Sequence, residues 1–180
     1  MSRYLRKVNP CLPLLDESSF RAQYMNARHR ISPALLANLY AHSLTFWRHD
    51  PLLSRERCPD VRFVWNLAIE ASYSELHASA GISTIKSLLL DVGGRPTTSM
   101  TGNGVRLSSA ISLCHSLGLN RNPLPWDIPQ AEKHLRMKIW WSILLHDRWY
   151  VLNREVSGYR IIPKSNFFSG QVLLMVHHPI

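Results

Sequence analysis

The segment from Asn103 to Ile162 constrains the fold most, because it contains two helical patterns joined by a Pro-rich corner. In the first pattern, from about Val105 to Leu117, apolar side chains recur on one face with the helical period. Gly118 and then Leu119 follow it, which predicts a left-handed helix end with an apolar contact back onto the last turn. The second pattern begins near Gln130 and continues to about Asn153. Neither pattern contains a spacing of polar residues that is typical of a catalytic site.

The second pattern changes character along its length. Its first half is amphipathic, with Leu135, Ile139 and Ile143 on one side and basic residues elsewhere. From Trp140 onward, apolar side chains point in almost every direction around the helix axis. Because a helix that is apolar all round is normally buried, we predict that residues 130–153 form a buried helix at the centre of the domain.

Upstream of this segment, four shorter helices are predicted, each after a residue that caps helix N-termini well. These capping residues are Asp16, Ser32, Asp60 and Ser83. Between the fourth helix and the Asn103 region, residues 93–104, "GGRPTTSMTGNG", have the composition of an exposed loop. The predicted fold class is therefore all-α, a bundle of about six to seven helices in which neighbours are antiparallel.

Length and composition favour one domain, because 180 residues with 46% hydrophobic side chains can bury an ordinary core. We predict an N-terminal segment over residues 1–12, a helical domain over 13–168 and a tail of uncertain structure over 169–180. Residues 154–180 have no clear periodicity and fit either a strand or a frayed tail.

The net charge of +9 favours polyanionic partners, but the basic residues are dispersed and form no dense run typical of a nucleic-acid-binding arm. Cys11, Cys58 and Cys114 are too far apart for paired metal ligands, so no metal or other cofactor is predicted in this chain. The sequence has no secretory signal and no apolar stretch of about 20 residues. We expect a protein that stays inside the cell and has no membrane partner.

His146, Asp147 and Arg148 are candidate functional residues because they are ionisable groups within an apolar half-helix. Adjacent residues on a helix do not face each other, so these three need partners on other helices. We predict that Asp147 forms a buried ion pair with a basic residue such as Arg106 or Arg121. A structural role is favoured over a catalytic one.

Other candidate groups also have simpler structural interpretations. Cys114, beside His115, lies on the inward face of its helix and fits a small core residue better than a nucleophile. His177 and His178 are near the end of the chain and lack further metal ligands. No catalytic, cofactor-binding, metal-binding or DNA-binding residue is therefore assigned, and the chain is not predicted to be an enzyme.

The run "LSSAISLCHSLGLNRNPLPWDIPQAEKHLRMKIWWSILLHDRW" resembles the middle region of the fungal zinc-cluster transcription factors. In that family a helix ending in Leu-Gly-Leu-Asn-Arg precedes a charged linker, a basic helix start, a Trp pair and an Asp-Arg pair. The matching residues here are 117–121, Glu132, Lys133, Arg136, Lys138, Trp140, Trp141, Asp147 and Arg148. The likeness covers most of residues 9–163.

This resemblance implies an all-α regulatory domain, located C-terminal to a DNA-binding module, that modulates transcription in the nucleus. Its expected partners are the transcription machinery or related proteins, with a small effector and homodimerisation as further options. The family binds zinc and DNA through a six-cysteine cluster that does not occur in this sequence.

Two departures from the family pattern stand out. The first is that the six-cysteine cluster is missing, and the second is that the family's Gly-Arg-Pro corner is replaced by "WYVLNREVSGYRI". The likeness stops after Phe168, from which we expect a truncated or mispredicted gene product. Two alternatives stay open: a helical enzyme built around His146, Asp147, His115 and Cys114, and a stand-alone helical adaptor.

Overall fold

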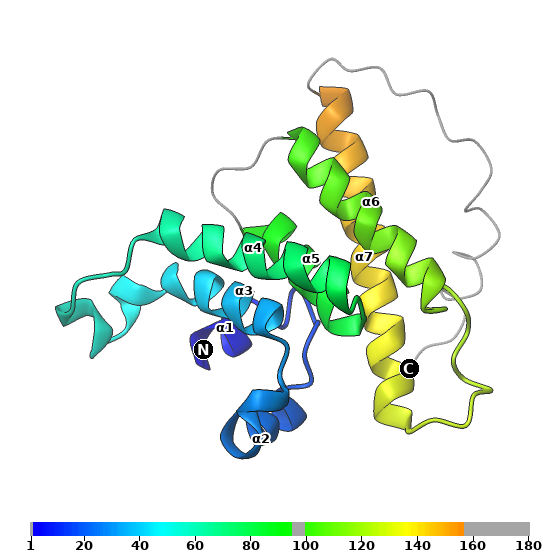
Figure 1. The fold of residues 1–180 in the computed structure, drawn as a ribbon, viewed down its shortest axis with the longest axis horizontal. Coiled ribbons are helices and arrows are strands. Elements are labelled where there is room, and N and C mark those ends of the chain that lie inside the picture. The colour runs from blue at the N-terminus through cyan, green and yellow to red at the C-terminus, as the bar shows by residue number, and fades with distance from the viewer. Residues whose placement is uncertain (1, 95–99, 157–180) are drawn as a thin grey trace. The chain divides into compact units, whose positions relative to one another are not determined.

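The computed structural model describes residues 2–94 and 100–156, and its regular elements there are all helical (Figure 1). The α-helices are α1 (Ser2–Lys7), α2 (Glu17–Asn26), α3 (Pro33–Leu44), α4 (Val61–Ala78), α5 (Ile82–Gly94), α6 (Met100–Ser116) and α7 (Gln130–Val156). Short 3-10 helices are η1 (Arg28–Arg30), η2 (Trp47–His49) and η3 (Leu53–Arg55). The predicted all-α fold class is confirmed.

Residues 1–147 form one compact unit, and the chain from Arg148 onward belongs to a second. The second unit is described only for the C-terminal part of α7. The alternatives for residues 157–180, including the predicted tail, lie outside the described residues. The domain boundaries drawn from the sequence stay predictions.

Three of the predicted helix starts form as their capping residues require. The side chains of Asp16 and Asp60 accept hydrogen bonds from the backbone N–H groups three residues later, at 2.9 and 3.1 Å. Ser32 accepts in the same way from Leu35 N–H at 3.1 Å, and Pro33 occupies the first turn. Each such cap satisfies a donor that the helix leaves unpaired and contributes about 1 kcal/mol.

The C-terminus of α6 is closed by Gly118, whose φ of +67° lies in the left-handed region that glycine adopts without strain. Leu119 N–H donates to Cys114 O at 2.9 Å, and Gly118 N–H donates to His115 O at 3.1 Å. These two bonds together define a Schellman motif. Leu119 is buried immediately after it, which confirms the predicted left-handed end followed by an apolar contact.

The tightest helix pair in the compact unit is α3 with α4. The two helices lie side by side and run in opposite directions (Figure 1). At their interface Ala41, Trp65 and Ala68 form a buried cluster, against which Ala37 and Val64 pack. Small side chains on both helices let the backbones approach closely, and the Trp65 ring fills the remaining space.

The central helix is α5, which packs against α3, α4 and α6. Its buried side chains include both apolar and polar groups. They are Thr84, Ile85, Ser87, Leu88, Leu89, Leu90 and Asp91. A helix that buries residues in consecutive positions has neighbours on most of its circumference, so α5 occupies the position that the sequence had assigned to residues 130–153.

The prediction that the second half of α7 is buried all round is wrong. Ile139, Trp140 and Ile143 are buried, whereas Trp141 and Leu145 are each 45% exposed. The buried positions recur with the helical period and form one face. Apolar side chains around the whole circumference are not sufficient for burial, because described neighbours cover only one side of the helix.

The loop predicted over residues 93–104 is also wrong at both ends. Helix α5 continues to Gly94, and α6 begins at Met100, so residues 100–104 form its first turns. Helix α1 lies in the segment for which no helix was predicted, and its Tyr4 and Leu5 side chains are buried in the core.

Candidate functional site

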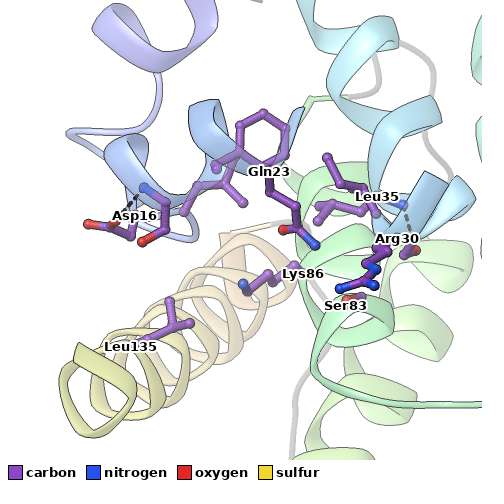
Figure 2. Close-up of a pocket in the computed structure, with 12 residues that line it drawn as sticks. Asp16, Gln23, Arg30, Leu35, Ser83, Lys86 and Leu135 are labelled. Atoms are coloured by element: carbon purple, nitrogen blue, oxygen red, sulfur yellow. Dashed lines mark hydrogen bonds between the residues drawn. The ribbon is translucent and has the colours of Figure 1, made fainter. Parts of the chain in front are cut away.

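A cavity of about 200 Å³ lies among α2, η1, α3, α5 and the first part of α7 (Figure 2). Part of the lining is apolar. The apolar lining residues are Leu15, Phe20, Ile31, Leu35 and Leu135. Leu15 and Phe20 flank the N-cap of α2 at the positions of a hydrophobic staple, so the cap that starts α2 also shapes the cavity wall.

The rest of the lining is polar and carries two positive charges. Figure 2 shows the Gln23 amide above the Lys86 side chain, the Lys86 ammonium extended toward Leu135, and the Arg30 guanidinium next to Ser83. Ser83, one turn before Lys86, completes this polar part of the lining. Within the described chain, neither Arg30 nor Lys86 has an ion pair, which leaves both cations available to a ligand.

Lys86 is largely removed from water although it has no anionic neighbour. This burial lowers the pKa of its ammonium to about 8, because desolvation penalises the charged form. At pH 7 the group is therefore still mostly protonated. The cavity thus contains a poorly solvated cation at neutral pH.

The carboxylates of Asp16 and Glu75 already accept hydrogen bonds from other groups. Asp16 caps α2 and accepts from Ser18 Oγ at 2.8 Å, and these hydrogen bonds lower its pKa to about 2. Glu75 on α4 accepts from Ser32 Oγ with one oxygen and from Thr84 Oγ1 at 2.8 Å with the other. Glu75 therefore links the N-terminal turns of α3 and α5 and is not a partner of Lys86.

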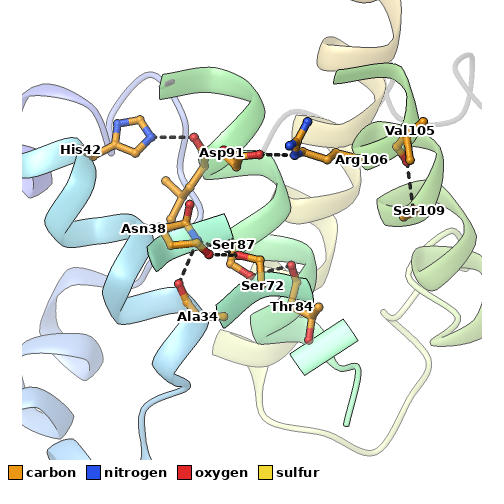
Figure 3. A network of polar contacts seen from close by, with 12 residues as sticks. Ala34, Asn38, His42, Ser72, Thr84, Ser87, Asp91, Val105, Arg106 and Ser109 are labelled. Carbon is orange, nitrogen blue, oxygen red and sulfur yellow. Dashed lines mark hydrogen bonds and ion pairs between the residues drawn. The ribbon is translucent and has the colours of Figure 1, made fainter. Parts of the chain in front are cut away.

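A second polar cluster lies deeper, along α5 (Figure 3). Asp91 forms an ion pair with Arg106 of α6, and both side chains are more than 90% buried. On α3, His42 Nε2 donates to Leu90 O at 2.7 Å. Desolvation lowers the pKa of His42, so the folded state favours the neutral ring.

Between α3 and α4 the polar contacts centre on Asn38. Its Nδ2 donates to Ala34 O and to Ser72 Oγ, both at 2.9 Å, and Ser72 Oγ donates to Ala68 O at 2.8 Å. All the groups are buried, so each bond lost would leave a desolvated donor or acceptor. The Asn38 Oδ1 atom is buried and has no hydrogen-bond partner among the described residues, whereas the Nδ2 bonds fix the register of the two helices.

The four residues of the alternative enzyme site do not line the cavity. Cys114 is fully buried, and burial raises the pKa of its thiol to about 12, which opposes thiolate formation. His115 packs edge-on against the Trp140 ring, and His146 Nδ1 donates to Ser142 O at 2.8 Å. Cys114, His115 and His146 thus have structural surroundings of their own, and none of the four residues lines the described cavity.

The predicted ion pair of Asp147 is wrong. Arg106 pairs with Asp91, and Asp147 is half-buried without an ion pair to any described residue. The reason is geometric: α5 lies against α6 and places its own carboxylate next to Arg106. Arg148 is exposed at the start of the second unit.

Over the described residues there is no group of three or more His, Cys, Asp or Glu side chains that could hold a metal ion. His177 and His178 lie outside those residues. Among the helices that the structure describes, none is long and apolar enough to cross a membrane.

The sequence analysis missed both Lys86 and Asp91. A signal was present, because the helix "ISTIKSLLLDVGG" contains one cation and one anion within an otherwise apolar and small-residue pattern. Such isolated charges in a buried helix need either a partner or a ligand. Asp91 has its partner in Arg106, whereas Lys86 faces the cavity.

Comparison with known proteins gives consistent matches to transcriptional regulators. The chain is 33% identical over 147 residues to an uncharacterized transcriptional regulatory protein of Schizosaccharomyces pombe, covering 82% of this chain and 22% of that protein. It is 29% identical over 163 residues to the transcriptional activator protein DAL81 of Saccharomyces cerevisiae, covering 90% and 16%. The chain thus spans about a fifth of the length of these relatives. No solved structure matches it significantly.

Residues 1–154 match the profile of the fungal specific transcription factor domain. The match includes all of α1 to α6 and nearly all of α7, together with the cavity and both polar clusters. The chain belongs to the fungal specific transcription factor domain family.

Proposed function

We propose that this chain acts as the regulatory domain of a nuclear transcription factor and modulates a DNA-binding module that lies outside this sequence. The observation that carries the proposal is the family match over residues 1–154. Two further facts support it. Both relatives are named as transcriptional proteins, and the candidates of the enzyme alternative differ in exposure, with Cys114 buried, His115 exposed, and His146 and Asp147 half-buried.

The proposed mode of action is contact with other proteins, namely the transcription machinery or related regulators, rather than chemistry or base recognition. The dispersed basic residues favour this reading, because sequence-specific recognition needs side chains placed together along one groove-sized surface. The proposed domain carries no zinc, since the six-cysteine cluster of the family does not occur in the sequence.

Regulatory activity is tested by tethering residues 1–180 to an unrelated DNA-binding domain in a fungal cell that carries a matching reporter. We expect reporter output to change relative to the DNA-binding domain alone, and the effect to disappear in a Leu89→Ala variant because Leu89 is fully buried in α5. A Lys7→Met variant, altered at an exposed position, is the matched control. Equal output from all four proteins would contradict the proposal.

DNA binding by the purified chain is the second test. We expect only weak, salt-sensitive binding that reflects the net charge of +9. Gel-shift titrations on unrelated duplexes at two salt concentrations measure this. A footprint at one sequence that persists at physiological salt would show that the chain reads DNA bases itself.

A further inference from the structure

The cavity near Lys86 has three features that are typical of a ligand-binding site. It contains two cations, Arg30 and Lys86, and neither forms an ion pair with a described residue. It has an amide donor and acceptor in Gln23 and a hydroxyl in Ser83. The remaining lining is apolar and includes Phe20 and Leu35.

The charges around the cavity favour an anion. Asp16 is the one carboxylate in the lining, and its oxygen already accepts from the backbone and hydroxyl groups of its own turn. The hydrogen bonds of Asp16 lower its pKa, and the positive charge of Lys138 lowers it further. Glu75 is bonded to Ser32 and Thr84. An entering anion would therefore meet two positive charges against one occupied carboxylate.

Size and polarity restrict the class of anion further. A cavity of about 150 Å³ in another protein accommodates benzene, so about 200 Å³ suits a body of roughly six carbon atoms. An inorganic phosphate would meet the cations but leave the apolar lining uncovered. A purely apolar ligand would leave the Lys86 ammonium without a counter-ion.

We propose that this cavity binds a small monocarboxylate with an aliphatic body, its carboxylate at the Lys86 ammonium and its chain against apolar lining residues such as Phe20 and Leu35. Because α2, α3 and α5 all contribute to the cavity, such a ligand would stabilise their packing. The site goes beyond the proposed regulatory function. Its test requires no transcription readout, so the two proposals can fail separately.

Hexanoate is a suitable probe for the whole 180-residue chain, with hexanamide as its uncharged analogue and inorganic phosphate as an anion without an apolar body. Isothermal titration calorimetry at pH 7 is expected to show saturable binding of hexanoate. Hexanamide is expected to bind on the order of ten-fold more weakly, because the charge-assisted hydrogen bonds are lost. Phosphate is expected not to displace hexanoate.

Lys86→Met is the decisive variant, since it removes the ammonium and keeps most of the aliphatic stem. We expect it to lose hexanoate affinity by about ten-fold or more, whereas Lys7→Met, altered outside the cavity, binds as the wild type does. Arg30→Gln is expected to weaken binding less, because Arg30 is exposed to water. Unchanged circular dichroism and an unreduced melting temperature would show that Lys86→Met still folds.

A pH titration supplies an independent readout. Affinity for hexanoate should fall between pH 7 and pH 9 as Lys86 loses its proton, and this fall should be absent in Lys86→Met. The absence of saturable hexanoate binding would overturn the proposal, as would equal affinity in a folded Lys86→Met variant. Displacement of hexanoate by phosphate at similar concentrations would overturn the assigned ligand class.

Discussion

Helix α5 is more buried, and helix α7 less buried, than the apolar content of their sequences suggests. Helix α5 contains Ser, Thr, Lys and Asp, yet it lies at the centre and buries Thr84, Ser87 and Asp91. Helix α7 contains the Trp pair and several leucines, yet Trp141 and Leu145 are about half exposed. The number of helices that surround an element decides how much of it is buried, and the apolar content of its own sequence does not reveal that number.

The two helices also treat their charges differently. Asp91 in α5 is paired with Arg106 in a dry interface, whereas Asp147 in α7 is half-buried and lacks an ion pair to a described residue. A fully buried charge is costly without a partner, so an ion pair stabilises the fold most at a carboxylate that is fully removed from water, as Asp91 is. Substitutions at matching kinds of position in α5 and α7 test whether burial and charge pairing differ between the two helices.

The largest expected effect is that of Asp91→Ala. It leaves the Arg106 guanidinium buried without its carboxylate, and we expect a loss of about 3–5 kcal/mol in the free energy of unfolding. Asp147→Ala in α7 should change it by less than about 0.5 kcal/mol. Urea titrations followed by circular dichroism measure both. Similar losses for the two variants would mean that the carboxylates are equally important.

The next largest loss of stability is expected at Leu89 in α5, and Leu145 in α7 serves as its half-exposed counterpart. Leu89→Ala removes a fully buried side chain from α5 and should cost about 2–5 kcal/mol, since the surrounding helices cannot close the cavity completely. Leu145→Ala in α7 removes a side chain that is 45% exposed and should cost below about 1 kcal/mol. The same urea titrations apply. A larger loss from Leu145→Ala would show that α7 is covered in solution.

A smaller effect is expected at the C-terminal end of α5. A Cβ added at Gly94 would overlap the His42 ring, which is held by Leu90 O and packed edge-on against Tyr4 and Trp65. Gly94→Ala should therefore cost about 1–3 kcal/mol. Gly81→Ala, before α5, meets nothing within 4 Å and serves as the control. Thermal melts that place both variants at the same midpoint would contradict this.

The smallest effect concerns pH. Because the pKa of His42 is lowered in the folded state, the unfolded state binds a proton first as pH falls below its ordinary value of 6.5. Stability from the neutral ring is thus present above that pH and is lost on acidification. Wild-type protein should lose more stability between pH 7.5 and pH 5.5 than His42→Gln does. His29→Gln, altered at an exposed histidine, should keep the wild-type dependence.

Local signals in the sequence predicted much of the secondary structure correctly. Asp16, Ser32 and Asp60 begin their helices, and Gly118 ends α6, because caps and left-handed glycines depend on a few neighbouring residues. The resemblance carried by residues 117–148 agreed with the family match for the same reason: it rests on the order of residue types along the chain.

The candidate site could not be predicted in the same way. Gln23, Arg30 and Lys86 come from three separate elements, and no spacing along the chain indicates that they line one cavity. The partner of Arg106 was likewise decided by which helix lies against α6. Each of these contacts depends on the distance between elements after packing.

The helical class, most of the helix starts, one helix end and the family follow from the order of the residues, because they depend on local backbone chemistry. The central place of α5, the buried ion pair of Asp91 and the position of Lys86 at a cavity follow only from packing. Desolvation depends on all the neighbours of a side chain at once, and these neighbours come from segments that are distant in the sequence.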